Sequence, residues 1–129
     1  MALATGMSAL GLGNDIGGSL RWPAHCNGIA TIKPTQGRIP AYNESALSER
    51  PMLAHLMSCQ GPLARSIADV RLCLEAMSQR DPRDPWWVPA PLAGPKLKGP
   101  IKVALAKLPS DMKVDPSVRA DRAGSWLPD

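Results

Sequence analysis

Ser19 is the residue whose neighbours best suit it for chemistry. It follows Asp15 and the pair Gly17 and Gly18, and Arg21 stands two positions later. Paired glycines let the backbone adopt positive φ or approach a ligand closely, so a tight turn here can aim successive N–H groups at one point. Such a turn binds an anion, or the oxyanion that forms when a hydroxyl attacks a carbonyl. One short segment can therefore hold a nucleophile together with the donors that stabilise its product.

A serine nucleophile also requires a base within hydrogen-bond reach. His25 lies six residues after Ser19. On a helix, that spacing falls about 120° short of two full turns, so we expect His25 to face elsewhere. His55 interrupts an apolar run and is typical of a core or surface histidine. Lys33 is the nearest lysine for a serine–lysine pair, but its spacing does not single it out. From these residues alone, a helix-capping role for Ser19 is favoured over a catalytic one.

The glycines at 11, 13 and 17 can also be interpreted as a dinucleotide-binding loop. Their spacing departs from the Gly-x-Gly-x-x-Gly pattern of such loops. The Asp15 carboxylate would repel a phosphate, and Pro23 shortens the helix that should follow. These three features argue against a dinucleotide site.

The composition narrows the class of protein. The chain has 129 residues, enough for one domain of ordinary size, and a net charge of +4 without a long run of lysines and arginines. This charge argues against direct nucleic-acid binding. No apolar run approaches the roughly 18 residues of a membrane span, and no secretory signal is present. Cys26, Cys59 and Cys73 lack metal or redox spacing. We therefore expect reduced thiols, a cytoplasmic location, and neither a metal nor a cofactor.

The elements that must position Ser19 alternate between strand and helix, which predicts an α/β fold with a mixed sheet flanked by helices. The clearest helix is predicted from Ser66 to Ser78, because Ser66 and Asp69 resemble a capping box ahead of apolar residues at helical spacing. The pair Gly61 and Pro62 is expected to break the chain. The remaining predictions are strands at 8–13, 29–32, 52–58 and 101–106, and helices at 20–27 and 117–127, the first ended by Gly28.

Three regions follow from this pattern. Residues 1–80 hold the nucleophile loop, 81–100 are a proline-rich extended connection, and 101–129 hold a strand and the beginning of a helix. Trp86 and Trp87 are interpreted as pinning the connection down, in preference to forming a ligand platform. The segment 2–10 is apolar without a polar lead-in. We therefore expect further sequence before Met1 and an incomplete fold.

Several segments together resemble the amidase-signature family. That family's pattern is small-x-Gly-x-acid-x-Gly-x-Ser-aliphatic-Arg-x-Pro-small. The chain meets it at Gly11, Gly13, Asp15, Gly17, Ser19, Leu20, Arg21, Pro23 and Ala24. A downstream pattern matches at Gly28, Lys33, Pro34, Thr35, Gly37, Arg38 and Pro40, and the segments 61–70 and 81–85 resemble later family blocks. The resemblance covers nearly the whole chain.

The resemblance implies a chemistry and a set of roles. The family hydrolyses or transfers carboxamides through a triad of serine, cis-serine and lysine. It implies that Ser19 is the acyl-enzyme nucleophile and that the backbone N–H groups of the Ile16–Ser19 segment (Ile16, Gly17, Gly18 and Ser19) form the oxyanion hole. Asp15 and Arg21 would support the loop. The implied partner is a small-molecule amide substrate, and the parent enzyme could be a homodimer.

The chain also departs from the family pattern. The family's cis-serine and catalytic lysine belong before the position of Met1, and Lys33 corresponds to a different, downstream lysine. We therefore expect an internal piece of an amidase that is inactive alone. Two alternatives stay open at this point: a non-catalytic remnant or interaction module, and a piece of the amidase-type component of a tRNA-dependent amidotransferase.

Overall fold

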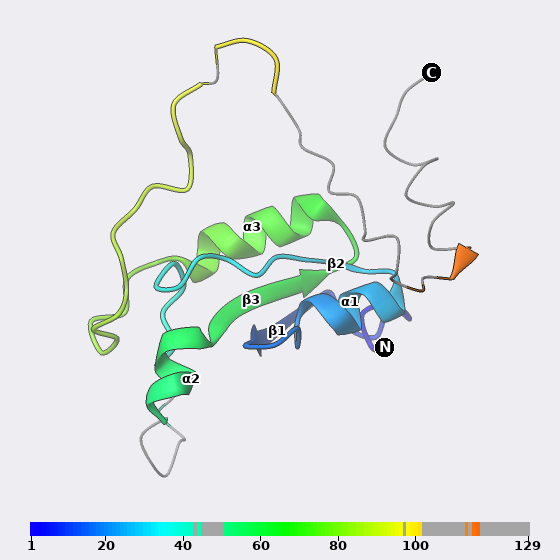
Figure 1. Ribbon diagram of the computed structural model, residues 1–129, viewed down its shortest axis with the longest axis horizontal. Coiled ribbons are helices and arrows are strands. Elements are labelled where there is room, and N and C mark those ends of the chain that lie inside the picture. Colours follow the sequence, from blue (N-terminus) through cyan, green and yellow to red (C-terminus); the bar gives the residue numbers. More distant parts are fainter. Residues whose placement is uncertain (43, 45–50, 97, 102–112, 114, 117–129) are drawn as a thin grey trace. The chain divides into compact units, whose positions relative to one another are not determined.

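The computed structural model describes residues 1–42, 44, 51–96, 98–101, 113, 115 and 116. The chain divides into two compact units, Met1–Gly94 and Pro95–Asp129. All the helices and strands discussed below lie in the first unit (Figure 1). The strand predicted at 101–106 and the helix predicted at 117–127 fall outside the described residues, apart from Ile101, which is in neither a helix nor a strand.

The first unit is built on a three-stranded antiparallel sheet with the order β1-β3-β2. Strand β1 (Leu10–Asp15) pairs along its whole length with the central strand β3 (Cys59–Ala64), and β2 (Ala30–Thr31) pairs with the end of β3. Three helices accompany the sheet: α1 (Arg21–Asn27), α2 (Met52–Met57) and α3 (Ile67–Met77). The predicted α/β class is confirmed, and the three described strands are all antiparallel.

Two helices follow their sequence signals closely. In α1, Pro23 lies in the first turn, and Gly28 ends the helix with a left-handed φ of 60°. At the start of α3, the Ser66 hydroxyl accepts the backbone N–H of Asp69 at 3.1 Å. Both helices were predicted because their start and stop signals are local.

The segment 52–64 contradicts two predictions. Residues 52–57 form the helix α2 and not a strand, in line with their Met, Leu and Ala content and the absence of β-branched residues. Gly61 and Pro62 do not break the chain, because they lie inside β3, the central strand. A Cβ atom at Gly61 would come within 2.5 Å of the Ile32 carbonyl oxygen and of Leu20 Cδ1. The glycine is therefore there for close approach and not for a turn.

Pro62 is tolerated in a central strand because of where its backbone points. Its carbonyl oxygen accepts the Thr31 hydroxyl at 2.7 Å, so the polar edge of Pro62 faces β2. The paired residues of β2 end at Thr31, which lies opposite Leu63. In an antiparallel pair a residue's N–H and C=O point the same way, so the missing N–H of Pro62 forfeits no ladder bond.

The core lies around β3. Helix α3 packs against β3 and β2 and turns Val70 and Cys73 inward, while α1 contacts β2 (Figure 1). Leu20 and Ala64 are fully buried. Among the described residues, no helix is long and apolar enough to cross a membrane.

The proline-rich connection has no helix or strand among the described residues of 81–100. Trp87 Nε1 donates to the Ser78 carbonyl at 3.1 Å, at the end of α3. The Asp84 carboxylate accepts the Ala41 N–H at 2.7 Å, and the Val88 N–H donates to the Gly37 carbonyl at 2.9 Å. The connection is thus held to two parts of the first unit, and Trp87 does the pinning predicted for the tryptophan pair.

Candidate active site

Strand β1 ends at Asp15 and helix α1 begins at Arg21, and residues 16–20 between them form what we call the nucleophile loop. Gly18 has a φ of 130°, a conformation that residues with a side chain rarely adopt, so the loop turns at this glycine. Ser19 follows directly and is exposed. The next residue, Leu20, is fully buried. The turn therefore sends adjacent side chains in different directions, the hydroxyl to the surface and the leucine to the core.

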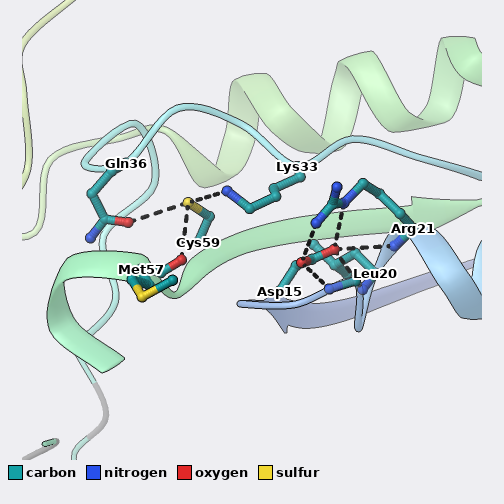
Figure 2. A network of polar contacts seen from close by, with 8 residues as sticks. Asp15, Leu20, Arg21, Lys33, Gln36, Met57 and Cys59 are labelled. Atoms are coloured by element: carbon teal, nitrogen blue, oxygen red, sulfur yellow. Dashed lines mark hydrogen bonds and ion pairs between the residues drawn. The ribbon is translucent and has the colours of Figure 1, made fainter. Parts of the chain in front are cut away.

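Asp15 organises the nucleophile loop from beneath. Its carboxylate is fully buried. It accepts the backbone N–H groups of Gly18 at 2.7 Å, Leu20 at 3.1 Å and Arg21 at 3.3 Å (Figure 2). Helix α1 has no side-chain cap at Leu20, so the Asp15 carboxylate satisfies the N–H groups at its start. One side chain thus fixes both the loop and the helix that follows it.

Arg21 completes the support of Asp15. Its Nε donates to Asp15 Oδ2 at 3.1 Å and its Nη2 donates to Oδ1 at 3.0 Å, a two-pronged ion pair. This pairing outweighs the effect of burial, and the bonds from the loop N–H groups add to it, so the pKa of Asp15 lies well below its usual range. The carboxylate is therefore ionised at neutral pH and tied to a partly exposed guanidinium.

Leu20 anchors the nucleophile loop to the sheet. Hypothetical Cβ atoms at Gly13 in β1 and at Gly61 in β3 would lie 3.0 and 2.5 Å from the Leu20 side chain. Two strand glycines therefore make the space that this leucine fills. Because Leu20 is held this way, the position of Ser19 beside it is fixed by packing as well as by hydrogen bonds.

Ser19 opens onto a surface hollow of about 670 Å³. The hollow is lined by Gly17, Gly18, Ser19, Arg21, Trp22, Pro23 and His25. His25 thus borders the same hollow as Ser19, contrary to the expectation that it faces elsewhere. The expectation was wrong because Ser19 lies in the turn before α1, so helical angles cannot be counted from it. Among the described residues, no hydrogen bond joins His25 to Ser19.

The four predicted oxyanion donors differ in what they bind. Among the described residues, the N–H groups of Ile16, Gly17 and Ser19 make no hydrogen bond to the protein. The N–H of Gly18 is already donated to Asp15. Three of the four groups are therefore available to a bound oxygen, while Gly18 serves the loop.

Lys33 belongs to a separate network at Cys59. Its Nζ donates to Cys59 Sγ at 3.2 Å, and the thiol donates to Gln36 Oε1 at 3.2 Å (Figure 2). Gln36 Nε2 in turn donates to the His55 carbonyl at 2.6 Å. This chain of contacts links the 33–36 segment to β3 and α2, and in it Lys33 serves Cys59 and not Ser19. The sequence held no signal for the network, because its members lie far apart in the chain.

Comparison with known proteins adds a family to this geometry. The sequence profile described as Amidase matches residues 1–124. The chain is 79% identical over 119 residues to "Indoleacetamide hydrolase" of Bradyrhizobium diazoefficiens and 77% identical over 119 residues to that of Bradyrhizobium japonicum. In both cases the match covers 92% of this chain. The amidase-type component of a "Glutamyl-tRNA(Gln) amidotransferase" of Gluconobacter oxydans is 36% identical over 88% of the chain.

These relatives are longer than the chain. The matches cover 23%, 26% and 22% of the three relatives, so the chain spans about a quarter of their length. A solved structure described as "An unexpected vestigial protein complex reveals the evolutionary origins of an s-triazine catabolic enzyme" is similar as well. It matches 67% of this chain and 18% of its own with a TM-score of 0.57 and 36% identity.

Proposed function

The chain belongs to the amidase family, and from that premise we propose that it carries the nucleophile segment of an enzyme that hydrolyses a carboxamide through an acyl-enzyme on Ser19. One observation carries the proposal. Ser19 is exposed at the edge of a hollow, at the tip of a loop that a buried, ionised carboxylate holds in place. A merely structural serine needs no such support, whereas a nucleophile requires a fixed position.

The proposed reaction has two steps. Ser19 Oγ attacks the carbonyl carbon of the amide, and the N–H groups of Ile16, Gly17 and Ser19 stabilise the oxyanion that forms. The C–N bond then breaks, and the nitrogen leaves as a protonated amine or ammonia. Water cleaves the resulting ester, releasing a carboxylic acid and restoring the Ser19 hydroxyl. No step requires a metal or a cofactor.

The proton relay is the part that this chain does not supply. Among the described residues, Lys33 is engaged by Cys59 and His25 makes no hydrogen bond to Ser19. The family resemblance assigns the relay to a cis-serine and a lysine outside these 129 residues. We propose that the chain alone therefore has little activity, since loss of the base from such a unit lowers turnover by roughly 10⁴- to 10⁶-fold.

The substrate that we propose is the amide of an aryl-substituted acetic acid. Support comes from the two relatives that are 79% and 77% identical, both named for hydrolysis of indoleacetamide. Identity to the amidotransferase is only 36%, which disfavours a role in tRNA-dependent amide transfer. For location we propose the cytoplasm, because Cys26, Cys59 and Cys73 are all free thiols in the structure.

A chimera tests the function. The matched 119-residue segment of the Bradyrhizobium diazoefficiens hydrolase is replaced by that of this chain, so that the hydrolase supplies the rest of the fold. A fluorophosphonate probe should label the chimera at Ser19, as located by peptide mass spectrometry, and Ser19→Ala should abolish both labelling and amide hydrolysis. Cys26→Ala, which removes an exposed thiol, is the control and should label normally. Unchanged hydrolysis in Ser19→Ala would refute the proposal and favour a non-catalytic role.

A further inference from the structure

Trp22 is an exposed tryptophan three positions after Ser19. It is 71% exposed, although tryptophan has the largest apolar surface of any side chain. It also lines the hollow onto which Ser19 opens. An aromatic face left bare beside a nucleophile is suited to contact whatever the nucleophile attacks.

The position of Trp22 is coupled to the nucleophile loop. Its backbone N–H donates to the Gly18 carbonyl at 2.7 Å. A Cβ atom at Gly18 would lie 3.9 Å from Trp22 Cβ, so the root of the side chain adjoins the turn. On α1 the buried side is marked by Ala24, which leaves Trp22 on the face turned away from the core. The indole is therefore placed by the same contacts that place Ser19.

His25 extends the aromatic surface. Its ring centroid lies 6.0 Å from that of Trp22, with the two planes tilted by 38°, and both side chains line the hollow. Residues three apart on a helix share a face, which is how α1 presents the two rings together. The surface beside Ser19 thus consists of two rings and a proline.

The charges around the hollow favour a neutral ligand. Arg21 is the one residue among those lining it with a permanent charge, and its guanidinium is paired with the buried Asp15 carboxylate. No carboxylate lines the hollow in the part of the chain that the structure describes. An uncharged, flat acyl group therefore meets the aromatic face without needing an ionic partner.

From these contacts we propose that Trp22 is the specificity-determining residue of the site: its indole is the wall on which a planar aromatic acyl group stacks while Ser19 attacks the amide. This inference rests on the proposed function and goes beyond it by assigning substrate choice to one side chain. Trp22 acts through contact with the non-reacting part of the substrate. It should therefore contribute mainly to binding of aromatic substrates and leave the chemistry of small amides intact.

The test compares two kinds of amide in the chimera. For indoleacetamide and phenylacetamide, Trp22→Ala should lower kcat/KM by about 10- to 100-fold, mostly through a higher KM, as expected for loss of one aromatic wall. For propionamide, kcat/KM should change by less than about threefold. Trp22→Phe keeps a flat ring and should recover most of the activity on the aromatic amides. Trp86→Ala, at another exposed tryptophan outside this hollow, is the matched control and should change neither.

Each other outcome has a separate meaning. An equal loss on aromatic and aliphatic amides, with a lower melting temperature, would show that Trp22 packs against the rest of the enzyme and would overturn the inference. An unchanged kcat/KM for the aromatic amides would overturn it as well. If the unaltered chimera labelled at Ser19 but preferred propionamide, only this inference would fail. If no probe or amide acylated Ser19, the proposed function itself would fail, and the inference with it.

Discussion

Asp15 is the single residue on which the geometry of the site depends most. Its two carboxylate oxygens accept five hydrogen bonds, three from the backbone and two from the Arg21 side chain. A buried carboxylate is costly unless its charge is paired and its lone pairs are satisfied, and here both conditions hold. The pairing is short-range in sequence, so the spacing of Asp15 and Arg21 already suggested loop support. The sequence could not show that Asp15 also replaces the missing cap of α1.

The pH dependence of stability tests the role of Asp15. Because its pKa is depressed in the folded state, it contributes stability above its ordinary pKa of about 3.9 and loses that contribution as the pH falls toward the folded value. In the chimera, Asp15→Asn should lower the free energy of unfolding at pH 7 by roughly 2 kcal/mol or more. The difference in melting temperature between the two proteins should shrink below about pH 4.

Asp81→Asn is the control for that measurement. The pKa of Asp81 is also lowered, to about 2, mainly by its side-chain hydrogen bond with Arg83. That pair lies in the proline-rich connection, and both residues are partly exposed, so its loss should matter much less. A melting-temperature gap between the chimera and Asp15→Asn that stayed constant down to pH 2 would contradict the role given to the Asp15 charge.

At the scale of elements, the outcome for each prediction depends on how local its signal is. The ends of α1 and α3 are set by Gly28 and Ser66, which act on neighbouring backbone groups, and both were predicted. Strand β3 was missed because its Gly61 and Pro62 usually punctuate a chain. Only the sheet explains them: Gly61 admits Leu20 and Ile32, and Pro62 faces the end of β2. Such reasons depend on residues about 30 to 40 positions away, which no local pattern contains.

Gly61 gives a prediction at this scale. Gly61→Ala places a methyl group against the Ile32 carbonyl and the Leu20 side chain, and one of them must move. Crowding of this kind costs about 1–3 kcal/mol, and displacement of Leu20 should also disturb Ser19 beside it. We expect a lower melting temperature and slower probe labelling in the chimera. Gly94→Ala is the matched control, because its Cβ atom would meet nothing within 4 Å, and it should change neither quantity.

At the scale of the whole molecule, the described residues leave much apolar surface uncovered. On β1, Leu12 is 70% exposed; on α2, Met52 and Leu53 are 76% and 69% exposed; on α3, Ile67 is 71% exposed. Uncovered apolar surface on several elements at once marks contact with further protein. The solved relative shares the fold over 18% of its own length, so in that protein most of the structure lies outside the matched part.

The 129-residue chain and the chimera should therefore behave differently. Alone, the chain should self-associate, bind a hydrophobic dye and hydrolyse arylacetamides at least about 10⁴-fold more slowly than the chimera, because it lacks both covering surface and proton relay. In the chimera the same residues gain both, and the protein should elute as a discrete species with labelled Ser19. Size-exclusion chromatography with light scattering, dye fluorescence and amide turnover measure the difference. A monomeric chain that unfolds cooperatively and acylates Ser19 as fast as the chimera would mean that the exposed faces need no cover. The base would then have to come from within these residues, with His25, on the rim of the same hollow, as the first candidate to mutate.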